Sequence, residues 1–347
     1  MNWARGYSAE SYLSILDRYT HKDVGRIEIV DGSIKRTLDL LRESADVTVR
    51  NLSLDKETLV RIWLDIHQSG ESSHIPLFTG LAMSPSDKIV GYKRKNSIQC
   101  YSVLKIADDI LLDRGWYAPA GIEGAILIKD LLSVCGFDIS IPEKTPEIKK
   151  SILAEKNETR LTMAEKILDA MGDWRLILDG MGNISVKPFA SDYSAIFDHK
   201  LIDILEPTID VNFDYYSCPN VLRVISDESH AVARDDDPNS IFSTVSRGRE
   251  VWKEEDVSGL NENETLGEYA YRKLKEYQSD SYKSVSYTRR FIPDIYPSDH
   301  VRLSLLGIGG SNEQEWINIK GDFVINSQTL SLGKKLSVSE EVSSTNG

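Results

Sequence analysis

The feature that most constrains the fold is an alternation of apolar residues with other residues in short runs. Residues 59–66 show it most clearly, because every second position there is apolar: Val60, Ile62, Leu64 and Ile66. A period of two places these side chains on one face of a strand. Similar runs at 26–30, 33–38, 46–49, 75–82 and 97–101 are separated by turn residues, and Asp31-Gly32 predicts a two-residue hairpin turn. About six short strands at this spacing predict a small antiparallel barrel.

A second set of strand-like runs occupies the last third of the chain. These runs lie at residues 221–226, 230–234, 243–247, 283–290, 301–305, 315–320 and 323–332. They predict a second antiparallel barrel. A helix at 265–278 interrupts it, since Thr265 and Glu268 form a capping-box signature before an apolar stripe.

The middle of the chain has a helical period instead. Helices are expected at 103–112 and 121–135, and Gly136 stands where a helix commonly ends. Residues 160–188 then read as a helix that stops at Gly172, followed by a β-hairpin with its turn at 179–183. A small α/β region therefore separates the two strand-rich regions.

These patterns together predict an α+β, β-rich fold with two antiparallel β-barrels and small α/β inserts. We expect an amphipathic N-terminal arm at 1–20 and the first barrel at 21–101. The small α/β domain follows at 102–200. The second barrel is expected at 201–335, with a helical insert at about 236–280, and a polar, flexible C-terminal tail at 336–347.

Composition excludes several classes of protein. The formal net charge of −13 argues against a protein that grips nucleic-acid phosphates, which needs clustered Lys and Arg. No stretch approaches the roughly 20 apolar residues of a membrane helix, and the first residues show no secretory signal. The three cysteines are far apart and show no metal spacing: Cys100, Cys135 and Cys218. We expect buried free thiols in a chain made in a reducing cytoplasm.

Two short stretches match part of a catalytic or cofactor-binding motif, but the elements that should accompany them are missing. Ser102 and Lys105 match the S-x-x-K of serine acyl enzymes, but the companion elements are missing, so a helix start is predicted. The glycines of residues 305–312 follow a strand without a helix behind them, which indicates a hairpin loop rather than a dinucleotide site. The six histidines never fall at H-x-x-x-H spacing. The sequence therefore predicts no catalytic residue, no cofactor and no metal site.

One acidic loop is a candidate for contact with a partner. Asp235, Asp236 and Asp237 cluster ahead of Pro238. Carboxylate oxygens can bind Ca²⁺, but this loop lacks the spacing and the distal glutamate of an EF-hand. It is interpreted as a solvated turn or as a partner-contact loop.

Three stretches give the chain a resemblance to a known family. They are VGRIEIVDGSIKRTLDL with HIPLFTGLAMSP, then RLTMAEKILDAMGDWRLILDGMGNISVKP, and finally CPNVLRVIS through ARDDDPNS and SRGRE to SVSYTRRFIPDIYPSDHVRLSL. In this layout the chain resembles the baseplate-hub, or tail-associated, proteins at the tail tip of phages and prophages.

The resemblance implies that the barrels are tail-tube-like and that the helix–hairpin braces them. It implies a homotrimeric structural virion protein that joins the sixfold tail tube to the threefold tail tip and lines the DNA channel. The implied partners are other copies of the chain, the tail tube, distal tail or baseplate proteins, the tape-measure protein, and a tail fibre or spike. DNA is in contact only in passage. Assembly is expected in the bacterial host cytoplasm, and the final location is the virion tail tip.

The resemblance implies no enzyme activity and no cofactor for this core. We also expect part of the acidic charge to line the channel, because an acidic wall repels phosphates. Two alternatives stay open. One is a tail-borne cell-wall hydrolase whose acid pair is hidden among the 54 acidic residues. The other is a carbohydrate- or receptor-binding module, suggested by six Trp and fifteen Tyr.

Overall fold

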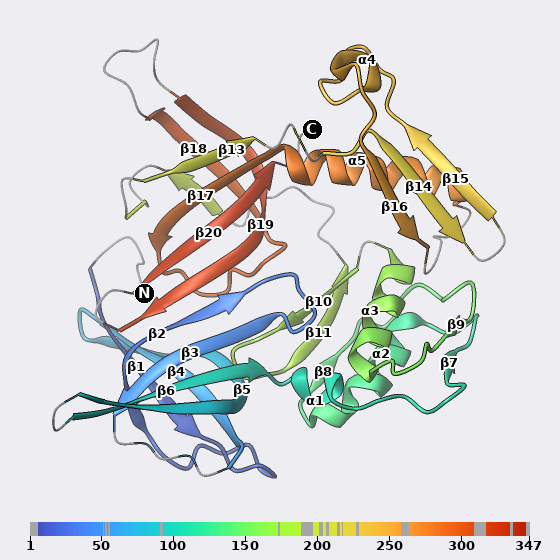
Figure 1. Cartoon of the computed structure of the whole chain (residues 1–347). Coiled ribbons are helices and arrows are strands. Elements are labelled where there is room, and N and C mark those ends of the chain that lie inside the picture. Colours follow the sequence, from blue (N-terminus) through green and yellow to red (C-terminus); the bar gives the residue numbers. More distant parts are fainter. Residues whose placement is uncertain are drawn as a thin grey trace.

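The structure is a computed structural model of the whole chain. It describes residues 6–50, 52, 54, 56–90, 93–172, 174–188, 197–200, 204–205, 208–213, 216, 218–226, 229–257, 264–308, 317–333 and 336–344. Figure 1 shows four units: two β units on one side of the molecule and two α/β units on the other. The predicted β-rich fold with α/β inserts is confirmed.

The first β unit is a closed antiparallel barrel. Its strands pair in the order β1-β4-β5-β6-β3-β2, and β1 pairs with β2 to close it. The strands are β1 (Ser8–Ile15), β2 (Ile27–Arg36), β3 (Glu43–Arg50), β4 (Thr58–Gln68), β5 (Glu71–Val90) and β6 (Lys93–Ser102). The apolar face of the 59–66 run fills the barrel, since Val60, Ile62, Leu64 and Ile66 are all buried. The first predicted barrel is confirmed.

Two expectations for this barrel are wrong. Residues 8–15 of the expected N-terminal arm form β1, which pairs with β4 along its whole length. Asp31-Gly32 is no turn, because it lies inside the continuous strand β2. A Cβ on Gly32 would stand 2.5 Å from the carbonyl oxygen of Asp46, so the glycine serves a close strand approach beside a bulge.

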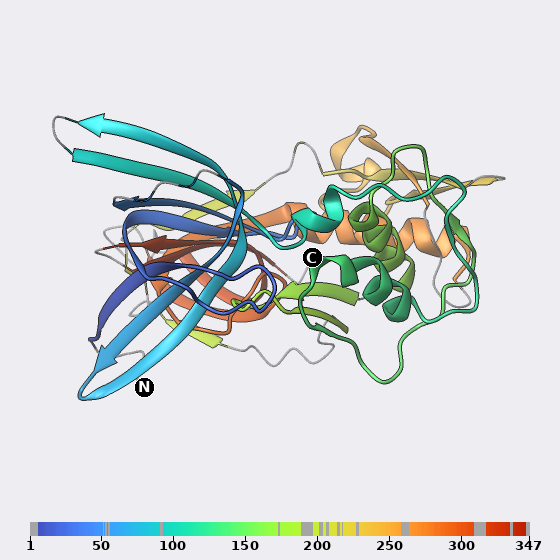
Figure 2. The ribbon, with the colours of Figure 1, turned by 90° about the horizontal axis from the view of Figure 1, so that it is seen from below.

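The middle α/β unit packs helices against two small sheets (Figure 2). Its elements are α1 (Lys105–Asp108), β7 (Tyr117–Ala118), α2 (Gly124–Leu132), the 3₁₀ turn Ser133–Cys135, β8 (Ile139–Ser140), β9 (Ile152–Leu153), α3 (Arg160–Met171), β10 (Trp174–Leu178) and β11 (Ile184–Pro188). Gly136 ends its helix in the left-handed conformation, as predicted. The cap of α3 is Thr159 with Thr162 at N3.

The turn between β10 and β11 docks this unit onto the barrel. The Thr79 hydroxyl donates to the Gly180 carbonyl over 2.8 Å, and Arg61 donates to the Met181 carbonyl over 3.1 Å. A Cβ on Gly180 would lie 1.9 Å from the Pro76 carbonyl oxygen, so this backbone contact requires glycine. On the same hairpin Arg175 donates to the Ser298 hydroxyl over 2.6 Å, which ties it to the second β unit as well.

The second β unit repeats the strand order of the first. Its order is β12-β18-β19-β20-β17-β13, the same order as β1-β4-β5-β6-β3-β2. One pairing differs in direction, because β12 pairs parallel with β18 where β1 pairs antiparallel with β4, so this edge departs from the predicted antiparallel barrel. The strands are β12 (Phe197–Lys200), β13 (Asp210–Phe213), β17 (Lys283–Arg290), β18 (His300–Ile308), β19 (Ile317–Leu332) and β20 (Ser337–Ser344). In the described part of the chain β12 and β13 are not paired with each other, so only the first barrel closes there.

Strand β19 also joins the two β units. Its residues 328–332 pair antiparallel with residues 36–32 of β2, so both units belong to one twelve-stranded sheet. Leu330, Val338 and Phe291 of the second unit pack into the core of the barrel. The two units therefore lie side by side with a shared core.

The predicted flexible tail is wrong for residues 337–344. They form β20, which lies between β17 and β19 and pairs with both. Few residues in this stretch are apolar, yet they alternate correctly, and Val338, Glu340 and Val342 all point inward and are buried. The stretch looked like a tail because Glu340 stands where a strand usually has an apolar residue.

The insert in the second β unit is larger than predicted and is not merely helical. A three-stranded sheet in the order β15-β14-β16 packs against one long helix. Its elements are β14 (Val221–Ser226), β15 (Ser229–Arg234), α4 (Thr244–Arg247), β16 (Trp252–Asp256) and α5 (Leu266–Tyr282). The predictions that place residues 221–226 and 230–234 in the second barrel, and 243–247 in a strand, are wrong. Residues 244–247 are helical because Ser243 caps them.

Candidate functional site

The candidate site is the outer face of the sheet that runs through both β units. We call it the polar face, and it covers β6, β3, β2, β19, β20, β17 and β13 in that spatial order. Its side chains are exposed or half-buried. They are Ser97, Gln99, Ser44, Asp46, Thr48, Asp31, Ser33, Lys35, Ser327, Thr329, Ser331, Ser337, Ser339, Glu341, Ser286, Thr288 and Asp210. Most of these groups are neutral hydroxyls.

Strand pairing builds this face from alternate residues. Thr329 of β19 stands opposite Lys35 of β2 on one side and Ser339 of β20 on the other. Ser339 is in turn opposite Thr288 of β17, and the two hydroxyls are 3.0 Å apart. Residues opposite each other in antiparallel strands share one face. The polar face therefore passes from the first β unit to the second without interruption.

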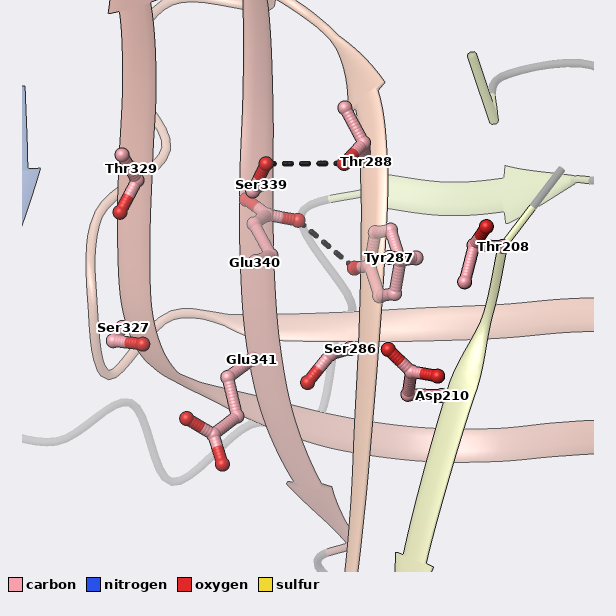
Figure 3. A pocket seen from close by; sticks show the side chains of 10 residues that line it. All are labelled: Thr208, Asp210, Ser286, Tyr287, Thr288, Ser327, Thr329, Ser339, Glu340 and Glu341. Carbon is pink, nitrogen blue, oxygen red and sulfur yellow. Dashed lines mark hydrogen bonds between the residues drawn. The ribbon is translucent and has the colours of Figure 1, made fainter. Parts of the chain in front are cut away.

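Figure 3 shows a hollow on this face in the second β unit. Its side chains come from β17, β20, β19, β13 and Thr208 just before β13, and Asp210 and Thr208 lie across from the other three strands. The lining is Thr208, Asp210, Ser286, Tyr287, Thr288, Ser327, Thr329, Ser339, Glu340 and Glu341. Hydroxyls and carboxylates of this kind can accept and donate hydrogen bonds, but they offer no cation for a phosphate.

A buried ionic network lies directly beneath the hollow. The Arg289 guanidinium donates to Glu340, and the side chains are 1% and 0% exposed. The Tyr287 hydroxyl donates to the other Glu340 oxygen, Oε2, over 2.9 Å, and the Gln328 amide donates to Oε1, the oxygen that Arg289 contacts, over 2.6 Å. Burial, and then the neighbouring Glu340 charge, raise the pKa of Tyr287 well above its ordinary value. The network fixes three adjacent strands under the polar face.

A second buried ion pair lies where the first barrel, the second β unit and the middle α/β unit meet. Arg36 donates to the Glu43 carboxylate over 2.8 Å and to the Leu77 carbonyl over 2.7 Å. The Arg36 guanidinium also lies over the Tyr296 ring, at 4.7 Å from its centroid. Burial raises the pKa of Glu43 to about 7 against the attraction of Arg36, and the nearby Asp179 adds to the rise.

This raised pKa predicts a pH dependence of stability. The folded pKa of about 7 exceeds the unfolded value of 4.5, so Glu43 contributes stability at acidic pH that is lost as the pH rises through 7. The difference in unfolding free energy between wild type and Glu43→Gln should therefore change by up to about 3 kcal/mol between pH 4.5 and 7.5. Urea unfolding across this range measures it. A difference that is constant with pH would contradict it.

The acidic loop from the sequence lies in the second α/β unit rather than on the polar face. Asp235 is buried and accepts hydrogen bonds from Ser240 over 2.6 Å and from Gln278 over 3.0 Å. Burial alone would raise the pKa of Asp235, but these hydrogen bonds hold it below the ordinary value. Asp236 pairs with Arg234 at 2.9 Å, and Asp237 accepts from the Asn239 backbone over 2.9 Å. These contacts hold the loop in its conformation. Its role in partner contact stays a prediction.

The other residues that the sequence analysis considered have structural contacts. Ser102 donates to the Leu41 carbonyl, while Lys105 pairs with Asp108 and Asp109. All three cysteines are buried and free, as predicted. Within the described ranges, no cluster of three His, Cys, Asp or Glu side chains could hold a metal ion. Among the described helices, none has the combination of length and hydropathy that a membrane-spanning helix needs. The loop after Ile308 lies outside the described residues.

The polar face itself was missed at the level of the sequence. Its signal is present, because Ser and Thr alternate with buried residues along β17, β19 and β20. Serines at alternate positions also occur on any exposed strand, however, so the pattern becomes meaningful only once the strands are adjacent.

Solved structures share this fold. The tail protein from Neisseria meningitidis MC58 superposes with a TM-score of 0.67 at 14% identity, over 97% of this chain and 97% of that one. The 43 kDa tail protein of prophage MuSo2 from Shewanella oneidensis gives 0.66 at 15% identity, over 96% and 98%. A prophage tail protein from Listeria monocytogenes EGD-e gives 0.55 at 13% identity, over 97% and 94%. No protein-family model and no curated protein matches the sequence. The chain thus has the fold of phage and prophage tail proteins.

Proposed function

We propose that this chain, which folds as phage tail proteins do, is a structural virion protein that forms a homotrimeric hub at the distal end of a phage or prophage tail. Three chains join the sixfold tail tube to the threefold tail tip. The tube, distal tail or baseplate proteins, the tape-measure protein and a fibre or spike are its partners. It is assembled in the host cytoplasm and ends at the virion tail tip.

The observation that supports this proposal most is the repeated strand order of the two β units. One chain presents two equivalent units side by side, so three chains present six. A threefold ring of such chains can therefore match a sixfold partner, which three copies of a single unit could not.

The polar face suits the wall of a channel that DNA passes. Phosphates are held by clustered Lys and Arg, and this face carries mainly hydroxyls with few cations. The charged side chains among the residues that define this face are four carboxylates, those of Asp31, Asp46, Asp210 and Glu341, against the single lysine Lys35, so the proposal keeps an acidic contribution to the lining. DNA in contact with it would find hydrogen-bonding partners without the electrostatic attraction that stops it from moving.

The proposal includes no catalysis. A zymogram on peptidoglycan tests the hydrolase alternative, and clearing by the pure chain would contradict a solely structural role. Asp235, Asp236 and Asp237 stay the proposed partner-contact loop, because Asp236 and Asp237 are exposed while the buried Asp235 holds the loop in shape.

The threefold state is tested by absolute mass from light scattering at several concentrations. The expected mass is near three times 39.1 kDa. A stable dimer or tetramer would overturn the hub proposal. If the chain is a monomer at every concentration, the test is repeated on purified tail particles. Absence of the chain from those particles would overturn the hub proposal.

A further inference from the structure

The two β units can be matched residue by residue through their bulges. In the β5–β6 pair the register shifts between Ala82 and Ser84, opposite Cys100 and Gln99. In the β19–β20 pair the same shift lies between residues 325 and 327, opposite residues 342 and 341. Thr329 then corresponds to Ser86, and residue 331 to residue 88. Across the sheet, β13 corresponds to β2 in the same way. Residue 211 of β13 pairs with residue 285 of β17, just as residue 34 of β2 pairs with residue 45 of β3.

The strand edge that follows the bulge is paired in the second β unit, and in the described part of the first β unit it is unpaired. After its bulge, β19 pairs with β20 on one side and with β2 on the other. After its own bulge, β5 pairs with β6 through residue 90, whereas its pairing with β4 stops at Ala82. In the described strands, the other edge of residues 84–90 therefore has no neighbour. Figure 2 shows this hairpin projecting from the barrel at the upper left.

A complementary open edge occurs at the opposite end of the sheet. Strand β13 pairs with β17 and is the last strand in its direction within the described part of the chain. Its counterpart β2 is the strand that fills the edge of β19. In the described strands, one copy thus has two unpaired edges. The outer half of β5 corresponds to the part of β19 that β2 pairs with, and β13 corresponds to β2.

We infer that β13 of one copy pairs antiparallel with the outer half of β5 of the next copy, in the register of the internal β2–β19 junction. Transfer of that register places Asp210 opposite Lys88 and Asn212 opposite Ser86. The first pair has opposite charges, which favours cross-strand pairing. Asp210 is exposed in the single chain and lies on the polar face. The interface is head-to-tail, and it rests on the proposed function for its closure into a ring of three.

A disulfide across the inferred junction tests this register. Antiparallel neighbours come within about 4.5–5.5 Å between Cα atoms, which is close enough for a disulfide. Asn212→Cys with Ser86→Cys should therefore give, after mild oxidation, a ladder on a non-reducing gel that ends at three chains. The matched control is Lys35→Cys with Thr329→Cys, the same register inside one chain, which should cross-link without any change in mass. Each single-cysteine variant should give no ladder.

The outcomes separate this inference from the proposed function. A trimer by light scattering that gives no ladder, while the internal control cross-links, overturns the β13–β5 pairing and leaves the hub intact. A ladder that continues beyond three chains supports the pairing and overturns the threefold hub. No ladder at any concentration or in purified particles overturns the inferred interface.

Charge reversal gives an independent readout. Asp210→Lys or Lys88→Asp alone should move the midpoint of trimer formation to a protein concentration about three- to tenfold higher at low salt, because three interfaces each lose one favourable pair. The double reversal should restore the wild-type midpoint. A double variant as weak as either single variant would contradict the predicted register.

Discussion

A chain that ends at Leu336 is expected to lose the second β unit as a folded body. The truncation removes β20 from between β17 and β19, and with it the buried Val338 and Val342. Burial of two valines contributes about 3–6 kcal/mol. The buried Arg289 also loses its partner, at a cost of about 3–5 kcal/mol. The sum is comparable to the total stability of a domain.

The control for this truncation is a chain that ends at Ser344, which keeps all of β20. Limited proteolysis with mass spectrometry is the measurement. Rapid cleavage within residues 283–332 of the shorter chain, with residues 8–102 protected, is the expected pattern. Equal protection of that region in both chains would show that β20 is dispensable and would contradict its central place in the sheet.

Glu340→Ala is expected to cost about 3–5 kcal/mol of unfolding free energy, the second-largest effect. The substitution leaves the Arg289 guanidinium buried without a counter-charge and removes the acceptor of both Tyr287 and Gln328. A buried charge without a partner retains its full desolvation penalty, which the ion pair had offset. Chemical denaturation at neutral pH measures the loss.

The next residue supplies a matched control. Glu341 lies on the same strand with the same chemistry, but it points to the polar face and is exposed. Glu341→Ala should change the unfolding free energy by no more than about 0.5 kcal/mol. Similar losses in the two variants would mean that the buried network contributes nothing beyond strand propensity. Glu340→Gln should fall between them, because it keeps hydrogen bonds but not the charge.

Both predictions bear on the proposed assembly. Glu340 and Arg289 fix the strands that carry the hollow of the polar face, and Gln328 of the same network stands opposite Arg36 in the junction of the two β units. Loss of this network should therefore weaken the junction that places two equivalent units side by side. A variant that stays folded but does not form trimers would point to this junction.

Much of the local structure could be predicted from the sequence. The period of two at residues 59–66 gave a buried strand face, and the glycine at 136 gave a helix end, because both depend on neighbours within a few residues. The hairpin of residues 174–188 follows from its turn residues in the same way. These features together indicated a β-rich chain with α/β inserts.

Errors arose where a distant contact overrode a local signal. Asp31-Gly32 is a typical hairpin turn, yet the close approach of Asp46 and Val47 from β3 keeps it in a straight strand. Residues 337–344 read as a polar tail because Arg289, about fifty positions earlier, is what allows Glu340 to be buried. Ion pairs across strands are not visible in local composition.

The alternation along each strand, and hence which face of each strand is polar, can be read from the amino-acid sequence. That seven such strands lie side by side, and that their hydroxyls form one face, follows only from the folded arrangement. The folded arrangement also decides that β2 fills the edge of β19 while the equivalent edge of β5 stays open in the described strands. The physical reason is that side-chain period is a local property of the backbone, whereas strand order and register are set by contacts between residues up to three hundred positions apart.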